Sequence, residues 1–220
     1  MPKLILEWLW PCLTPPSPEE ESRQQMWLRS EQEKVDQGSW SDKNDVALEE
    51  ARRLFDAEHE RRRGADSKAG LYLAAITALI PILATILPGL WDDQISKVLR
   101  GTLLGIFICA LLYLMRAGLW ALQTIKIKAA AQLGAGDIAE SFSSDKPEKQ
   151  LVKQLLSAVI YNYTGTNQKI SCIKMTHEFL LRAFFCFLTF LAVQAVWPAA
   201  VWTIGRIHNE IITPLMSCFP

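Results

Sequence analysis

The fold is decided by residues 69–91, which read AGLYLAAITALIPILATILPGLW. This stretch contains no charged side chain. As a helix that rises about 1.5 Å per residue it extends about 34 Å, which is enough to cross the hydrocarbon core of a bilayer. An apolar run of this length is not expected in a small soluble domain. The sequence therefore predicts a first transmembrane helix, or span, at 69–91.

Two further apolar runs follow. Residues 101–125 are apolar except for Arg116, and residues 183–205 carry no charge between Arg182 and Arg206. We predict an all-α integral membrane protein with about three transmembrane helices and with helical cytosolic extensions of spans one and three. The expected segments are a polar, partly disordered arm (1–44), a cytosolic helix (45–68), span one (69–91), an outer loop (92–100), span two (101–125), a cytosolic helical segment (126–182), span three (183–205) and a short outer tail (206–220).

The polar segments also have helical patterns. From Asp45 onward an apolar stripe runs through a field of Glu and Arg, and no proline intervenes before Pro81. Between spans two and three, Leu151, Leu155 and Val159 recur at helical spacing and predict an amphipathic helix. The polar run at 162–167, with its asparagines and glycine, is expected to end that helix. A new helical face then leads into span three.

Basic residues near the span ends predict the orientation. Arg61, Arg62, Arg63 and Lys68 precede span one, whereas the short loop after it carries only Lys97 and Arg100. The N-terminus is therefore expected in the cytosol and the C-terminus outside. Tryptophans near the span ends are expected to anchor the chain at the two membrane interfaces, and these are Trp91, Trp120, Trp197 and Trp202.

Composition argues against several classes of function. The formal net charge is zero, so the chain lacks the basic surface of a nucleic-acid binder. Its five cysteines form no CxxC pair, and the three histidines are far apart in the sequence. There is no GxSxG, HExxH or phosphate-binding glycine loop. We expect no catalytic site, no metal and no cofactor.

Arg116 is the most informative single residue, because a charge inside a span costs at least about 2.5 kcal/mol at mid-bilayer. It either extends toward the cytosolic headgroups or faces other helices and a water-filled path in an oligomer. Gly101 and Gly105 in the same span have the GxxxG spacing that lets helices approach closely. This spacing gives weak support to helix association.

Asp66 and Lys68 lie at the cytosolic end of span one. In one interpretation they are interfacial anchors, with Lys68 on lipid phosphates and Asp66 paired with Arg62. In the other, they contact Asn167 or Lys169 ahead of span three and tie the cytosolic helices together. The candidate gating positions are Arg116, Asp66, Lys68, Asn167, Lys169 and Arg182.

Two passages resemble a known family. Glu58-His-Glu-Arg-Arg-Arg-Gly-Ala-Asp-Ser-Lys-Ala69 is similar to the charged approach to the first span of bacterial SLATT-type membrane proteins, and 162–181 is similar to their later segment. That family includes transmembrane effectors of Pycsar and CBASS antiphage systems. The resemblance implies a bacterial inner-membrane effector that oligomerises when a sensor fires and permeabilises the membrane. Pycsar effectors commonly append a cyclic-nucleotide-binding domain, and we expect none here, because only residues 206–220 follow the third span.

Two functions are therefore carried forward. The first is a toxin-like membrane effector of a bacterial antiphage system, whose partners are the lipid bilayer, further copies of the chain and a cytosolic sensor or regulator protein. The second is a membrane anchor or scaffold that recruits a cytosolic partner through the arm at 1–44. Deleting the arm separates them, because an anchor loses its activity and a pore-former keeps it.

Overall fold

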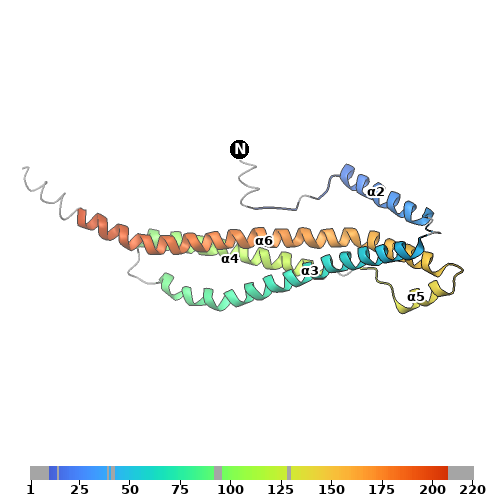
Figure 1. The fold of residues 1–220 in the computed structure, drawn as a ribbon. Helices are drawn as coiled ribbons and strands as arrows, with labels where there is room; N and C mark the ends of the chain where they lie inside the picture. The colour runs from blue at the N-terminus through green and yellow to red at the C-terminus, as the bar shows by residue number, and fades with distance from the viewer. Residues whose placement is uncertain are drawn as a thin grey trace, which may run out of the picture. The chain divides into compact units, whose positions relative to one another are not determined.

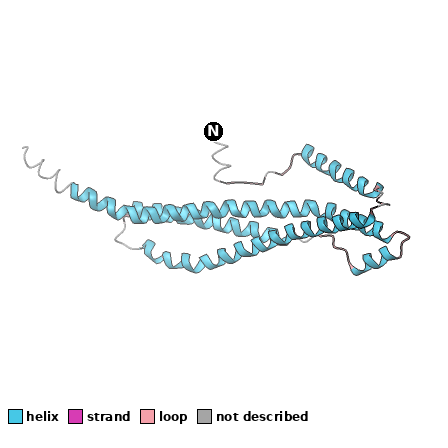
Figure 2. Ribbon diagram, in the orientation of Figure 1, coloured by secondary structure: helices cyan, strands magenta, loops and turns pink. Residues whose placement is uncertain are grey.

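The computed structural model describes residues 10–13, 15–38, 40, 43–91, 96–127 and 130–207. Figures 1 and 2 show helices joined by loops in this part of the chain. The elements in chain order are α2 (Pro18–Gln37), α3 (Asn44–Ile86), the 3-10 helix η1 (Pro88–Trp91), α4 (Lys97–Lys126), α5 (Ala135–Phe142) and α6 (Pro147–Ile207). The prediction of an all-α chain is confirmed.

The helices α3, α4 and α6 are long and apolar enough to cross a membrane. In their most apolar stretches only 11%, 28% and 17% of the residues are buried inside the protein. A helix that is apolar on its exposed sides is stable only where lipid replaces water. The chain is therefore an all-α integral membrane protein with about three spans.

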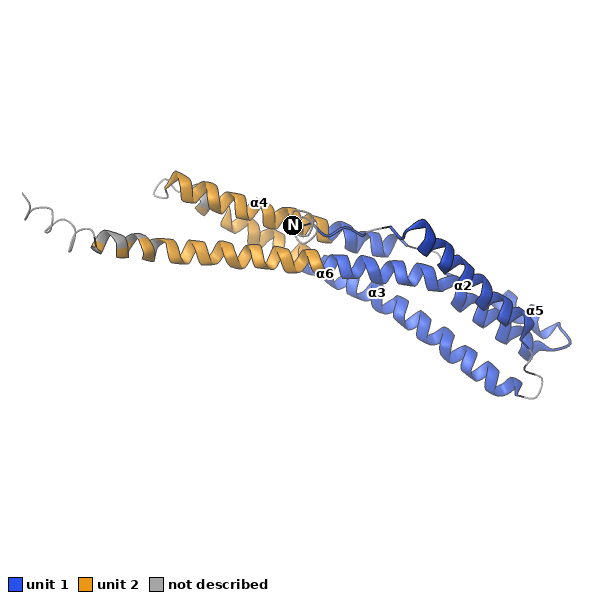
Figure 3. Cartoon of the chain, turned by 90° about the horizontal axis from the view of Figure 1, so that it is seen from above, with its two compact units in different colours: residues 1–75, 118–177 blue, residues 76–117, 178–220 orange. Residues whose placement is uncertain are grey.

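The chain divides into two compact units, which are coloured separately in Figure 3. Unit 1 comprises residues 1–75 and 118–177, and unit 2 comprises residues 76–117 and 178–220. Each of the three long helices contributes one part to each unit. Unit 2 takes most of the three predicted spans, and unit 1 takes most of the polar segments.

The core of unit 2 is apolar. Phe107 of α4 packs against Phe187 and Phe190 of α6, with ring centroids 6.4 Å and 6.0 Å apart. Leucines of α3 and α4 complete the cluster, among them Leu83, Leu99, Leu103 and Leu114. Aromatic pairs at this separation add to the packing that holds helices together in lipid, where burial of apolar surface gives little drive for association.

Unit 1 has a small apolar cluster and a longer polar interior. Ala51 of α3 packs on Val152 and Leu155 of α6. Within the described residues, every buried polar or charged side chain of the protein belongs to unit 1. These residues are Glu58, Arg62, Thr124, Ser141, Asn162, Thr166, Lys169 and Thr176.

The buried residues of unit 1 follow a coiled-coil spacing. On α3 they include Glu58, Arg62, Ala65 and Ala69, and on α6 they include Asn162, Thr166, Lys169 and Thr176. Steps of three, four or seven residues keep one side of a helix turned toward its neighbour. Alanines at such positions allow the helix backbones to lie close together.

Two expectations need correction or refinement. The predicted end of a helix at 162–167 is wrong, because α6 runs unbroken from Pro147 to Ile207. The side chains of Asn162 and Thr166 are buried, so packing overrides the low helix propensity of asparagine and threonine. Within the described part of the polar arm predicted at 1–44, Pro18–Gln37 form the helix α2. Pro81 does not end α3, which continues to Ile86.

Candidate functional site

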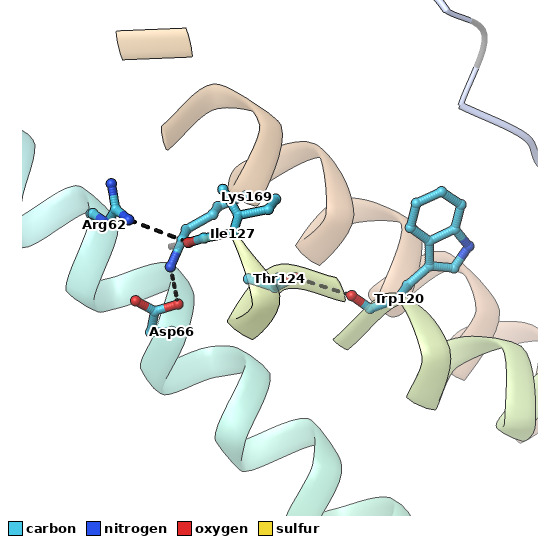
Figure 4. A network of polar contacts seen from close by, with 6 residues as sticks. All are labelled: Arg62, Asp66, Trp120, Thr124, Ile127 and Lys169. Atoms are coloured by element: carbon cyan, nitrogen blue, oxygen red, sulfur yellow. Dashed lines mark hydrogen bonds and ion pairs between the residues drawn. The ribbon is translucent and has the colours of Figure 1, made fainter. Parts of the chain in front are cut away.

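Among the residues that the structure describes, the most strongly buried ion pair joins α3 to α6. The Lys169 ammonium nitrogen lies 2.5 Å from Oδ1 of Asp66, and Figure 4 shows the lysine reaching across to the helix that carries the aspartate. The Lys169 side chain is 3% exposed, whereas that of Asp66 is 42% exposed. A buried ammonium group requires a partner, because its transfer from water costs several kcal/mol. Of the two contacts considered for Asp66, the structure forms the one between helices.

A second buried cation holds the chain that leaves α4. The Arg62 guanidinium donates a hydrogen bond of 3.2 Å to the carbonyl of Ile127, the residue after α4 ends. The carbonyls at a helix C-terminus have no partner within the helix, and a cation there also complements the helix dipole. One turn earlier, the Thr124 hydroxyl donates to the Trp120 carbonyl at 3.2 Å. Arg62 thereby ties α3 to the end of α4.

Arg61 makes a further bridge at the edge of the same network. Its guanidinium donates to Oε2 of Glu58 at 2.7 Å and to the side-chain oxygen of Asn167 at 3.2 Å. Glu58 is buried, and its second carboxylate oxygen has no hydrogen-bond partner among the described residues. The contact with Asn167 connects α3 and α6 a second time, close to the Asp66–Lys169 pair.

Asn162 holds the loop after α4 through its amide. Its nitrogen donates to the Ala131 carbonyl at 2.9 Å, and its oxygen accepts from the Ala131 N–H at 2.7 Å. One side chain therefore satisfies both polar groups of a backbone residue that lies outside any helix. Asparagine is the natural choice, because its amide offers a donor and an acceptor side by side.

Helix α2 is attached to α6 by few contacts. Gln32 donates to the Ser157 hydroxyl at 2.9 Å, Lys153 bonds the Asp36 carbonyl, and the rings of Trp27 and Tyr163 lie 5.2 Å apart. A cavity of about 880 Å³ remains between these segments, lined also by the loop at 131–133. No residue of α2 is buried. Its attachment is thus mostly polar and superficial.

The N-terminus of α2 is well capped. The Ser17 hydroxyl accepts from the Glu20 N–H, and the Glu20 carboxylate accepts from the Ser17 N–H at 2.9 Å. This reciprocal arrangement satisfies two backbone donors that the helix itself leaves open. The hydrogen bonds from Ser17 hold the pKa of Glu20 below its ordinary value.

The other sequence-predicted positions are not among the residues that these contacts join. Arg182 pairs with Glu178 at 2.7 Å within α6. Arg116 is half-buried on α4 in unit 2, and Lys68 is exposed on α3. At Gly101 and Gly105 an added Cβ would meet nothing within 4 Å, so no other described helix of the chain comes close there.

Three of the four predicted tryptophan anchors have described side chains. Trp120 is half-buried, whereas Trp197 and Trp202 are exposed. The Arg206 guanidinium lies 5.3 Å from the ring centre of Trp202. Exposed indoles at this end of α6 suit an interface between lipid and water. The side chain of Trp91 lies outside what the structure describes.

Sequence reasoning missed four members of the network: Glu58, Arg62, Arg61 and Asn162. The signal that could have found the first two is their spacing with Ala65 and Ala69, which places them on the inner side of α3. Asn162 was assigned to a helix break.

Burial raises the pKa of the Cys172 thiol, which keeps it protonated as a small packed side chain.

Comparison of the chain with protein-family models, curated proteins and solved structures gives no match. Within the described residues, no group of His, Cys, Asp and Glu is placed to hold a metal ion. The site is therefore defined by its geometry, as a network of ionic and hydrogen-bonded contacts that joins α3, α6 and the chain leaving α4. We refer to Glu58, Arg61, Arg62, Asp66, Asn162, Asn167 and Lys169, with their backbone partners Ile127 and Ala131, as the polar network.

Proposed function

We propose that this chain is a membrane effector whose polar network holds it inactive until a cytosolic sensor or regulator protein disturbs unit 1. Disturbed chains then oligomerise and disrupt the bilayer. The observation that carries the proposal is the ion pair between Asp66 and the buried ammonium group of Lys169. It lies on α3 and α6, and both helices continue from unit 1 into unit 2.

The physical argument concerns what buried ions do. A buried ion pair contributes little net stability, but breaking it by loss of one partner is costly. Such a pair favours one arrangement of the helices that carry it. Because its net stabilisation is small, another arrangement can replace that one at little cost. Conformational switches commonly act through a local change of charge or packing that biases an element with two arrangements. The polar network supports this proposal, because its ionic contacts join α3 to α6 and to the chain after α4.

The biological setting follows from the resemblance to SLATT-type proteins. We place the chain in a bacterial inner membrane, with its N-terminus in the cytosol, as a component of an antiphage system that stops growth of the infected cell. The basic residues at 61–68 support this orientation, because positive charge accumulates on the cytosolic side.

The test is inducible expression in a bacterium with two readouts, a membrane-potential dye and uptake of a DNA stain that intact cells exclude. We expect Asp66→Ala to depolarise cells more strongly than the wild type at equal membrane levels, because the arrangement that Asp66 favours is lost. The matched control is Glu50→Ala, which removes an exposed carboxylate of the same helix from a 3.7 Å surface pair. It should behave as the wild type. Intact membranes with every variant at full expression, with and without phage infection, would refute the effector role.

The second candidate is a membrane anchor that recruits a cytosolic partner through the N-terminal arm. The observation that favours it is the exposure of Met26 and Trp27 on α2, whose attachment is superficial. Deleting residues 1–37 distinguishes the two. An effector keeps or gains its effect on the membrane potential, whereas an anchor loses capture of its partner and never alters the potential.

A further inference from the structure

A groove opens between α3 and α6 within unit 1, beside the polar network. Its volume is about 290 Å³, and it is lined by Arg61, Gly64, Ala65 and Lys68 of α3 and by Ile170 and Ile173 of α6. Pockets that hold small molecules begin at about 300 Å³. The groove is thus at the lower limit of this range, which suits the polar end of a larger amphipathic molecule rather than the whole molecule.

The charge in the groove is positive. Arg61 is held in place by Glu58 and Asn167, and Glu58 compensates its charge. Lys68 makes no ion pair with any residue that the structure describes. The nearest carboxylate in sequence, that of Asp66, is paired with Lys169. One positive charge therefore remains without a counter-ion, and a second cation lies beside it.

The groove is also partly apolar. Ile170 and Ile173 form its α6 side, and Ala65 contributes from α3. At Gly64 an added Cβ would meet no atom within 4 Å, so space is open above the helix backbone. This combination suits a ligand that carries an anionic group and an apolar part in one molecule. A bare phosphate ion would leave the isoleucines uncovered.

The groove lies next to the start of the membrane-spanning part of α3. Lys68 is the last charged residue before the apolar run at 69–91. One turn further along, the Tyr72 hydroxyl lies 3.5 Å from Nδ1 of His177, and the two rings are 6.4 Å apart. Amphipathic rings of this kind are typical of the level of the lipid headgroups. The phosphate-bearing molecule expected at this level is therefore a phospholipid.

We propose that this groove binds the headgroup of an anionic phospholipid. Lys68 and Arg61 contact the phosphate oxygens, and Ile170 and Ile173 pack against the glycerol and the first carbons of the acyl chains. Basic recesses between membrane helices on the cytosolic side are suited to such headgroups. The proposal requires that the chain lies in a membrane and does not depend on the effector role.

The experiment is native mass spectrometry of the full chain in detergent, with phosphatidylglycerol, phosphatidylcholine or inorganic phosphate added. The wild type should retain phosphatidylglycerol, and neither phosphatidylcholine nor inorganic phosphate should be retained or compete. Lys68→Gln and Arg61→Gln should each weaken retention about fivefold, the usual effect of one cation near an anionic lipid surface. Lys68→Arg should preserve it.

Two further variants separate a defined site from general surface charge. Arg63→Gln removes an exposed cation of the same helix that does not line the groove, and should leave lipid retention unchanged. Gly64→Leu fills the groove without changing any charge, and should reduce retention as much as Lys68→Gln. Equal loss with Arg63→Gln, or full retention with Gly64→Leu, would overturn the proposal. Far-ultraviolet circular dichroism checks that each variant is folded.

Discussion

Units 1 and 2 are built on the same three helices but have opposite interiors. Unit 2 buries aromatic and aliphatic side chains, with Phe107, Phe179 and Phe190 among the largest fully enclosed. Unit 1 buries two cations, a carboxylate and several hydroxyl and amide groups. The unit that takes most of the polar segments thus has the polar core, and the unit that takes most of the spans has the apolar one.

The difference reflects how helices associate in lipid and in water. In lipid, apolar surface gains little from leaving the solvent, so helices associate through close packing of well-shaped side chains. In water, burial of apolar surface favours helix packing, whereas burial of ions has a desolvation cost. Their presence in unit 1 favours one arrangement of α3, α6 and the chain after α4. Four experiments test this contrast, from the largest expected effect to the smallest.

Phe107→Ala in unit 2 should give the largest loss, about 3 kcal/mol, because it empties the centre of the aromatic cluster. The measurement is the free energy of unfolding by SDS titration in mixed micelles. Phe184→Ala is the matched control, since that ring is 55% exposed and lipid replaces its contacts. Equal losses in the two variants would mean that unit 2 has no specific core.

Asp66→Ala should destabilise unit 1 by about 2 kcal/mol, less than the 3–5 kcal/mol of a fully buried pair because the aspartate is half-exposed. The substitution leaves the Lys169 ammonium buried without its carboxylate. Replacing Lys169 with Met in the same chain should restore most of the loss. Hydrogen exchange at 160–175 reports the effect, and a double variant no more stable than Asp66→Ala would argue against the buried-charge explanation.

Asn162→Ala should cost about 1–2 kcal/mol, since it removes two hydrogen bonds and leaves both polar groups of Ala131 unsatisfied. Exchange protection of the loop at 130–134 should fall most. Asn167→Ala serves as the control, because it loses one exposed bond to Arg61 and should change stability by less than about 0.5 kcal/mol. Unchanged protection at 130–134 in the Asn162 variant would contradict the role assigned to it.

Ser17→Ala should weaken only α2, by about 1 kcal/mol of local helix stability. The effect depends on pH, because the pKa of Glu20 is lower in the helix than in the unfolded chain. Its contribution is therefore complete above its ordinary value and is lost as the pH falls through the lowered one. Exchange of the amides at 17–22 should show this loss in the wild type, a smaller loss in Ser17→Ala, which keeps the N–H of residue 17, and hardly any in Glu20→Gln. An equal pH response in the wild type and Glu20→Gln would exclude the capping explanation.

The sequence predicts the membrane part of the fold better than the polar network. Charge-free runs such as 69–91 are long enough to indicate spans without further information. The pairing of Asp66 with Lys169 could be proposed, because both precede a span, but it could not be chosen over pairing with Arg62. The four-residue spacing allows the contact with Arg62, and only the packing of α3 on α6 brings Asp66 to Lys169.

Burial also explains the failures. Arg62 belongs to a run of three arginines, and such a run resembles a solvated surface. Arg61 and Arg63 are exposed, whereas Arg62 between them is buried. Asn162 and Gly165 resemble a helix break by propensity, yet α6 continues because Asn162 is engaged with Ala131. Propensity is a weak guide where tertiary contacts compete with it.

The spacing of buried residues in unit 1 limits how the length of this chain can change. Each added residue turns the rest of a helix by about 100°, so a single insertion between Asn162 and Lys169 would carry the lysine away from Asp66 while Asn162 stayed on Ala131. Seven added residues restore the original side almost completely. Insertions of seven residues at matching points of α3 and α6 would therefore lengthen unit 1 and keep the same side chains in its interior.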